Sequence, residues 1–281
     1  LVFHGASGGG GGAGIFATDT SAVVVGAGVQ VVGGDGGAGA PGRLGTTTST
    51  AGGGGGGGSG IVFDNGGSLV NNGGLVQGGN GGAGTNKWGS TTSATGGGGG
   101  GEAVQGANVN IINIGTLAGG QGGTGGVAGS SHAGNGEQGA AINWTGGSQN
   151  RLQMDAGSVI QGAVWVQGGA SAQIVANTDG LVMDNPFIFD GQGLLDTQAN
   201  TLTVQGVISG SGSLEKTGDG LLVLSGNNSY QGGTTVSAGT LSTSADGNLG
   251  AAGADLTLNG GTVQASSSYT MTRDITLGSA G

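Results

Sequence analysis

The stretch "IVFDNGGSLVNNGGLVQGG" at residues 61–79 decides the fold, because short β-branched and aliphatic runs alternate in it with Gly/Asn turns. Two stretches of similar length repeat the pattern: "IFATDTSAVVVGAGVQVVGG" at 15–34 and "AVQGANVNIINIGTLAGG" at 103–120. Each has room for three short strands and ends in Gly-Gly. Repeats of about 20 residues with this composition are typical of a solenoid of stacked β-coils.

The second half of the chain carries the same step in short apolar triplets separated by turn residues. The steps between the leading residues of successive triplets, Leu202, Leu222, Leu241, Leu256 and Ile275, are 20, 19, 15 and 19 residues. Alternation along each strand places Leu, Val and Ile inside and Thr, Ser and Gln outside. The β-branched content and the glycine density exclude a helical fold. We therefore predict an all-β protein, a parallel β-helix with three short strands per coil.

Three glycine-rich stretches, at 35–60, 80–102 and 121–139, interrupt this pattern. Each follows the Gly-Gly that ends a coil, so we expect all three to leave the solenoid at the same corner and to lie side by side. Of the 77 glycines, 52 fall in residues 1–140. The expected organisation is β-helix coils with inserted glycine-rich loops at 1–140, followed by regular β-helix at 141–281.

The glycine-rich stretches are phased. "GGDGGAG" at 33–39 and "GGNGGAG" at 78–84 have a three-residue period, with Asp35 and Asn80 in the third slot, and Gln121 holds that slot in the next stretch. Polyproline-II geometry has three residues per turn and directs its backbone polar groups to neighbours. The pattern predicts a polyglycine-II helix bundle whose third slot faces solvent. The alternative is a flexible linker, which the entropy cost of ordering glycine favours.

The composition excludes several classes of protein. The net charge is −10 with only five Lys and Arg, so the basic surface that nucleic acids require is missing. No apolar run is long enough to span a bilayer. The lack of cysteine excludes a disulfide scaffold, and two prolines are too few for collagen. The chain begins and ends within its repeat pattern, so we expect it to be part of a longer protein.

No catalytic or metal-binding motif stands out. His4 and His132 both lie in glycine-rich stretches, and no serine has a G-x-S-x-G context. Calcium-binding nonapeptides need Asp at the sixth position of G-G-x-G-x-D, where this chain has Ala38, Ala83 or Thr124. We therefore expect no enzyme activity, no metal site and no cofactor.

Several other residues have expected structural roles. Trp144, Trp165, Phe187 and Phe189 alternate with polar neighbours and are expected in the core. Asp179 and Asp184 are expected to cap turns or face solvent, and asparagines such as Asn108 and Asn113 are expected at turns or in a stacked ladder.

The candidate binding residues lie at the tips of the glycine-rich stretches, between the two glycine legs of each. They are Arg43, Lys87, Trp88 and His132. Trp88 lies where no core is available, and loops on a rigid scaffold are common binding sites. The alternative is that these tips are solvated caps without a binding role.

Residues 210–241, "GSGSLEKTGDGLLVLSGNNSYQGGTTVSAGTL", resemble the passenger-associated repeat of bacterial autotransporters. The pattern G-x-L-x-K-x-G-x-G-x-L-x-L-x-G-x-N-x-Y-x-G-x-T-x-V-x-x-G-x-L is matched from Gly212 to Leu241. The resemblance implies a right-handed parallel β-helix, exported by a Gram-negative bacterium through an outer-membrane barrel that would lie C-terminal to these residues. It supplies no catalytic residues, and residues 1–140 lie outside it.

Three function classes follow. The first is a surface-exposed or secreted autotransporter passenger that acts as an adhesin or cell-aggregation module. Its partners would be a host-cell or matrix surface, protein or glycan, or another copy of itself, with no nucleic acid and no membrane insertion by this chain. The second is a purely structural stalk, and the third is an ice-binding protein with regular Thr-bearing faces.

Overall fold

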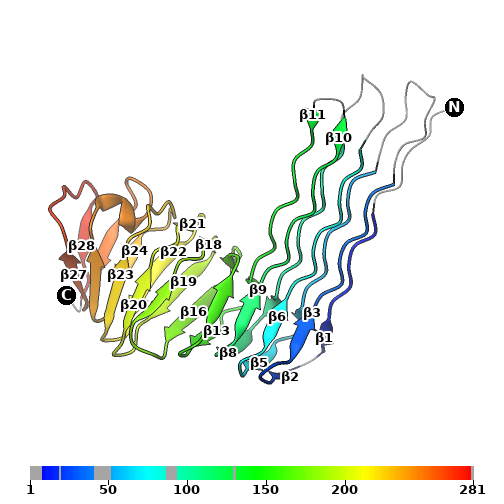
Figure 1. Cartoon of the computed structure of the whole chain (residues 1–281). Coiled ribbons are helices and arrows are strands. Elements are labelled where there is room, and N and C mark those ends of the chain that lie inside the picture. Colours follow the sequence, from blue (N-terminus) through cyan, green and yellow to red (C-terminus); the bar gives the residue numbers. More distant parts are fainter. Residues whose placement is uncertain (1–7, 19, 41–51, 87–93, 129–130, 280–281) are drawn as a thin grey trace.

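A computed structural model describes residues 8–18, 20–40, 52–86, 94–128 and 131–279. In this part of the chain, short strands stack into an elongated solenoid whose coils follow one another in sequence order (Figure 1). The helical element among the described residues is a single 3-10 turn, η1 (Asp246–Leu249). The prediction of an all-β parallel solenoid is confirmed.

The coils from β1 to β23 contribute three strands each, one to each face of the solenoid. The first face contains β1 (Ile15–Ala17), β4 (Ile61–Phe63), β7 (Val104–Ala107), β12 (Ile142–Gly146), β15 (Val164–Val166), β18 (Phe187–Phe189) and β21 (Ile208–Ser209). The second contains β2 (Ala22–Val25), β5 (Gly67–Asn71), β8 (Val109–Asn113), β13 (Asn150–Met154), β16 (Ser171–Ala176), β19 (Gln192–Asp196), β22 (Ser213–Thr217), β24 (Thr234–Val236), β26 (Leu256–Leu258) and β28 (Ile275–Leu277). The third contains one sheet of β3 (Gln30–Val32), β6 (Leu75–Gln77), β9 (Thr116–Ala118) and β14 (Val159–Gln161), and another of β17 (Leu181–Met183), β20 (Thr201–Val204), β23 (Leu221–Leu224), β25 (Thr240–Thr243) and β27 (Thr262–Ala265).

The strands of successive coils pair in parallel, and the register corrects one expectation. Leu202 pairs with Leu222, and Leu222 with Leu241, as the 20- and 19-residue steps predict. The 15-residue step is different: Leu241 pairs with Val263, whereas Leu256 lies on the second face opposite Thr234. The short step therefore joins strands on two faces. It could not be recognised from the sequence, because a triplet of β-formers does not reveal which face it occupies.

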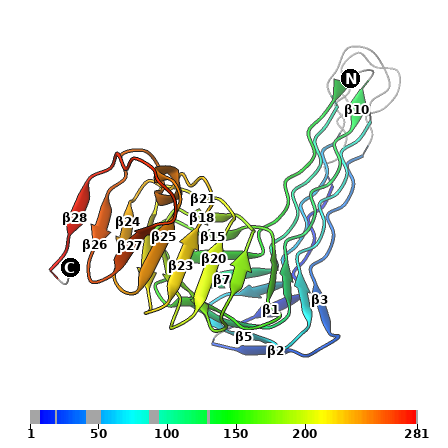
Figure 2. The ribbon, with the colours of Figure 1, turned by 60° about the vertical axis from the view of Figure 1, so that its left-hand side comes forward.

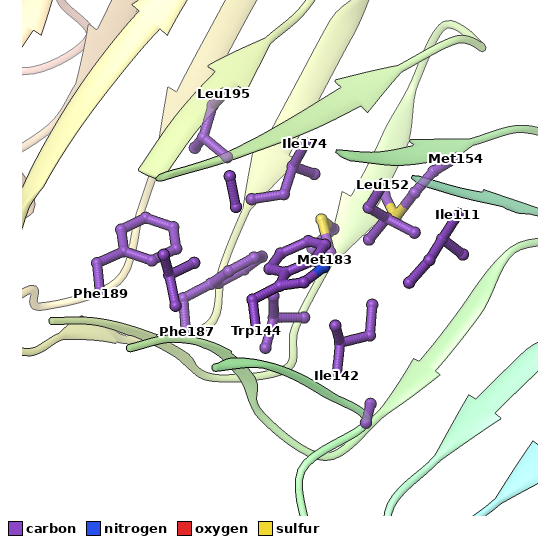
Figure 3. Close-up of a cluster of buried hydrophobic side chains, with 14 of the residues drawn as sticks. Ile111, Ile142, Trp144, Leu152, Met154, Ile174, Met183, Phe187, Phe189 and Leu195 are labelled. Atoms are coloured by element: carbon purple, nitrogen blue, oxygen red, sulfur yellow. The ribbon is translucent and has the colours of Figure 1, made fainter. Parts of the chain in front are cut away.

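Inward side chains from all three faces form one continuous core. Trp144, Phe187 and Phe189 are fully buried, and their rings lie together beside Met183 (Figure 3). The ring centroids of Phe187 and Phe189 are 5.6 Å apart and the rings are tilted by 59°, within the distance range over which aromatic pairs interact. Strands of two to six residues supply this core, and only every second side chain of a strand points inward.

Trp165 corrects a second expectation, since it lies outside the core. Val164 and Val166 of β15 are fully buried, so the pleat turns Trp165 between them to the outer face. There its indole N–H donates to Asp190 Oδ2 at 2.9 Å. The apolar character of the residue suggested burial, but the alternation of the strand decided its direction.

Asparagines stack inside the solenoid as expected. Asn71 and Asn113 are fully buried in neighbouring coils, and Asn71 Nδ2 donates to Asn113 Oδ1 at 2.8 Å. Asn108 lies at a turn with φ of 54°. Asp179 also behaves as expected, because its Oδ1 caps the N–H of Thr201 at 2.7 Å.

The glycine-rich segments leave the solenoid at one corner and project as long, side-by-side legs (Figures 1 and 2). The chain departs after β3, after β6 and after β9, and returns at β4, β7 and β12, whereas only two residues join β14 to β15. We name the legs by their residues. They are return leg 0 (8–14), outward leg 1 (33–40), return leg 1 (52–60), outward leg 2 (78–86), return leg 2 (94–102), outward leg 3 (119–126) and return leg 3 (133–140).

Candidate binding surface at the ends of the glycine-rich legs

Hydrogen bonds at every third residue join the legs into one bundle. Return legs 1, 2 and 3 each donate to their own outward leg in antiparallel orientation, and successive return legs bond to one another in parallel orientation. The bonds donated by return leg 1 include Gly55 N to Gly37 O (2.9 Å), Gly58 N to Gly34 O (2.8 Å), Gly54 N to Gly96 O (3.2 Å) and Gly57 N to Gly99 O (2.9 Å). A leg inside the bundle therefore contacts several others, and the chain between the solenoid and the tips is held along its length.

Glycine is required where two legs face each other. A Cβ added to Gly98 would lie 2.0 Å from the carbonyl oxygen of Gly55, and one added to Gly57 would lie 1.9 Å from that of Gly79. No side chain fits at such distances. In the uninterrupted glycine runs of return legs 1 and 2, such close approaches occur at two of every three residues, whereas Gly56, Gly96 and Gly99 are exposed.

The third slot of the triplets faces outward and makes its own bonds. The side-chain oxygen of Asp35 accepts the N–H of Asn80 at 2.6 Å, and that of Asn80 accepts the N–H of Gln121 at 3.0 Å. The outward direction agrees with the sequence pattern. The bonds were not foreseen: each of these side chains supplies an acceptor to the backbone of the next leg.

The ends of the legs nearest the tips are tied together by threonines. Thr95 Oγ1 accepts the N–H of Thr85 at 3.0 Å and donates to the carbonyl of Gly52 at 2.8 Å, so two loops are joined at their bases. The third loop is attached by Gly126, whose N–H donates to the carbonyl of Thr95 at 2.9 Å. Residues more than 40 positions apart are thereby held at one end of the bundle.

Among the candidate tip residues, His132 lies in the described part of the chain, whereas Arg43, Lys87 and Trp88 lie outside it, as does His4. His132 is exposed in β11 (Ser131–His132), which pairs antiparallel with β10 (Val127–Ala128) at the far end of outward leg 3. Beside it, the side chain of Asn86 accepts the N–H of Val127 at 2.8 Å.

The described residues contain no cluster of three His, Cys, Asp or Glu side chains that could hold a metal ion. Within the same residues, no helix has the length and apolar character that crossing a membrane requires.

A buried lysine marks the repeat region of the solenoid. Leu214 and Lys216 both point inward from β22, and Lys216 is fully buried. Its Nζ donates to the carbonyls of Thr217 (2.8 Å), Gly218 (2.6 Å) and Ala238 (3.2 Å). The ammonium group therefore closes a corner of the coil by satisfying three backbone acceptors.

Burial lowers the pKa of Lys216 to about 8, with the charges of Asp196 and Asp219 acting in the opposite direction. Alternation in the sequence placed Lys216 on the inward side, but its residue type argued for the surface. Only the three converging carbonyls explain a charged residue at this position.

The other inward positions of this region agree with the sequence pattern. Leu222, Leu224, Val236 and Leu241 are at most 1% exposed. Tyr230, also fully buried, forms a 2.6 Å hydrogen bond with the hydroxyl of Thr234.

The sequence model of the passenger-associated-transport-repeat family matches residues 214–242. The chain carries an autotransporter passenger repeat. This passenger repeat covers most of β22, all of β23 and β24, and most of β25, and it supports an autotransporter passenger domain. The family implies a secreted or surface location in Gram-negative bacteria. Comparisons with curated proteins and with solved structures gave no match.

Proposed function

We propose that this autotransporter passenger acts without enzymatic chemistry as an adhesin or cell-aggregation module at the bacterial surface or after release. The solenoid carries the glycine bundle, and the bundle presents three loop tips to a host-cell or matrix surface or to another copy of the protein. The observation that carries the proposal is the tie between the loop bases: at the far end of the legs, Thr95 bonds to Gly52 of the first loop and to Gly126 of the third.

The composition of the tips supports binding. Trp and Arg are the residues most often found at the energetic centres of interfaces, and the tips contain Trp88 and Arg43 beside several threonines. A loop whose base is already held loses less conformational entropy on binding than a free loop. The tips therefore combine suitable residues with a preorganised support.

We also propose that the legs are polyglycine-II helices. The support is the three-residue period of the interleg hydrogen bonds and the close approach of backbones at Gly57 and Gly98. A flexible linker needs neither feature. Protection of the Gly54 and Gly57 amides from hydrogen exchange would distinguish the bundle from a linker.

The test of the binding role is Trp88→Ala in the full chain. We expect weaker adhesion to host cells or weaker self-association, measured by binding of labelled protein and by sedimentation, with an unchanged melting temperature. A second variant replaces residues 87–93 with a short Gly-Ser turn and leaves Thr85 and Thr95 in place, because these two residues support the bundle. It should show the larger loss.

The control is Val182→Ala, on an exposed valine of the solenoid that is 58% accessible and belongs to β17. Its binding should match the unmodified chain. If both tip variants adhere and self-associate as well as the unmodified chain, the tips do not bind and the proposal is wrong.

A further inference from the structure

The third face of the solenoid is interrupted in the middle of the stack. One coil contributes β12, β13 and β14, and the next contributes β15, β16 and β17. The first two faces stay paired across these coils, β12 with β15 and β13 with β16. On the third face, β14 is the last strand of one sheet and β17 the first strand of another. Residues 131–279 are described without a break, so no strand of these two coils is missing from the gap.

The pleat explains why β14 and β17 do not pair. On both paired faces the step between the two coils is 22 residues, as from Ile142 to Val164. The same step would place Ile160, which packs against the core, opposite Val182, which is 58% exposed. In a sheet, inward residues lie opposite inward residues, and a slip of one residue turns every side chain to the other face. The two strands are therefore out of phase and form no ladder.

The gap has room for a strand. Most Cα–Cα separations between β14 and β17 exceed 8 Å. Neighbouring strands of a sheet lie about 4.8 Å apart, and two strands with a third between them lie about 9.6 Å apart. Residues of both strands, among them Ile160 and Val182, line one hollow of about 210 Å³. A second hollow of about 510 Å³ shares Ile160 with the first and extends to Gln138 at the base of return leg 3, so side chains leave this space unfilled.

Both edges direct backbone hydrogen-bonding groups into the gap. In β14, the N–H of Val159 and the carbonyl of Gln161 bond toward β9, at 2.9 and 2.8 Å. Successive residues of a strand bond to opposite sides, so the N–H and C=O of Ile160 face the gap. In β17, the carbonyl of Met183 accepts a hydrogen bond from the β20 side at 2.7 Å, so the N–H and C=O of Val182 face the gap.

A carboxylate lies at the rim of the gap. Asp184 directly follows β17, is exposed and lines both hollows. Among the residues that the structure describes, the one ion pair joins Arg273 to Asp246, so Asp184 has no cationic partner there. A lysine or arginine of a bound molecule would complement this charge.

We propose that the gap binds a free, extended segment of another polypeptide, which adds one strand between β14 and β17 and joins the two sheets. Two facing backbone edges are complementary to a third backbone, which is the basis of peptide recognition by strand addition. One side of the segment pairs with Ile160 and the other with Val182. The bound strand continues the parallel sheets that the third face already contains on either side of the gap.

A separate strand can satisfy both edges because its register with each of them is set independently. Its inward side chains lie level with Ile160 on one side and with Leu181 and Met183 on the other, all of which face the core. The segment therefore has apolar residues at alternate positions, and a lysine or arginine at its end lies near Asp184. This inference does not depend on the tips of the glycine-rich legs.

The test uses the whole chain and a capped peptide, Lys-Val-Ser-Val-Lys, whose two valines face the core and whose serine faces outward. In an NMR titration we expect saturable shifts of the Ile160 and Val182 amides, and slower exchange of both. One control peptide, Lys-Val-Pro-Val-Lys, lacks the central N–H and should bind at least about 5-fold more weakly. A second control, Glu-Val-Ser-Val-Glu, reverses the charge near Asp184 and should also bind more weakly.

Matched variants check the location. Val182→Pro removes an N–H that faces the gap and takes no part in the bonds to β20, and it should weaken peptide binding at least about 5-fold. Val182→Ala keeps this N–H and should bind the peptide as the unmodified chain does. Should Val182→Pro lower the melting temperature, Asp184→Asn gives a second check: it should abolish the preference for the lysine peptide over the glutamate peptide.

Three results would overturn the proposal: equal binding of the serine and proline peptides, equal binding by a folded Val182→Pro and Val182→Ala, or no shift up to the solubility limit of the peptide. Dimerisation of the chain alone that Val182→Pro abolishes would identify a second copy as the occupant and would also overturn it. Replacing residues 87–93 should leave peptide binding unchanged, so a failure of the tips to bind and a failure of the gap to bind are distinguishable.

Discussion

Replacing Gly98 by alanine is expected to open the bundle, because this residue faces return leg 1 at backbone distance. The added Cβ would lie 2.0 Å from the carbonyl oxygen of Gly55, where ordinary contacts begin at 3.4 Å. The two legs must therefore separate by about 1.4 Å. Gly54 N to Gly96 O (3.2 Å) and Gly57 N to Gly99 O (2.9 Å) are the bonds that such a shift breaks first.

Each lost hydrogen bond costs about 1 kcal/mol, so two to four of them give about 2–4 kcal/mol. The alanine restricts the unfolded chain and returns about 0.4–1 kcal/mol of this. Native-state hydrogen exchange measures the remainder. The amides of Gly54 and Gly57 should exchange roughly 5- to 400-fold faster than in the unmodified chain, at about 1.4 kcal/mol for each factor of ten.

The matched control is Gly134→Ala in return leg 3, where an added Cβ meets nothing within 4 Å. It has the same effect on the unfolded chain but causes no collision, so exchange at Gly54 and Gly57 should be unchanged. If the two variants exchange alike, the legs are not packed at backbone distance and the reasoning fails.

Three further predictions concern the solenoid and the third slot. Leu224→Asp places an unpaired charge at a position that is 1% exposed and should lower stability by several kcal/mol in thermal melts; an unchanged melting temperature would contradict the inward register. The pKa of Lys216 is about 8 in the folded chain, against a reference value of 10.5. Between these values the unfolded chain binds more protons than the folded chain, so the free energy of unfolding should rise from pH 8 to pH 10. Lys216→Met should lose this rise, and a pH profile identical to that of the unmodified chain would refute the prediction. Asp35→Val removes the acceptor of the Asn80 N–H and should speed exchange of that amide several-fold, whereas Asp35→Asn should restore protection; equal exchange in both variants would speak against the bond.

Much of the solenoid could be predicted from the sequence because its signals are local. A strand of alternating residues needs no distant information to place Leu222 and Leu224 on the same side, and Gly/Asn turns mark the corners. The same locality led to two errors. The 15-residue step from Leu241 to Leu256 was counted with the steps from coil to coil, and Trp165 was assigned to the core, since neither spacing nor hydrophobicity specifies which way a given strand faces.

The binding surface was less predictable. The tips around Arg43, Lys87, Trp88 and His132 could be identified as interruptions between glycine legs. Their support could not, because the bonds of Thr85 and Thr95 to Gly52 join different loops, and no sequence period records them. The acceptor role of Asp35 toward Asn80 likewise depends on which legs become neighbours.

The sequence by itself determined the all-β class, the coil length and the inward register of the passenger repeat, because these follow from alternation and turn chemistry within about 20 residues. Only the tertiary structure decided which glycine legs touch and why Lys216 is buried. These features depend on carbonyls and N–H groups that are brought together from separate coils. Because the backbone groups of every glycine are the same, the sequence does not show which glycine N–H and carbonyl groups are hydrogen-bonded and which are not.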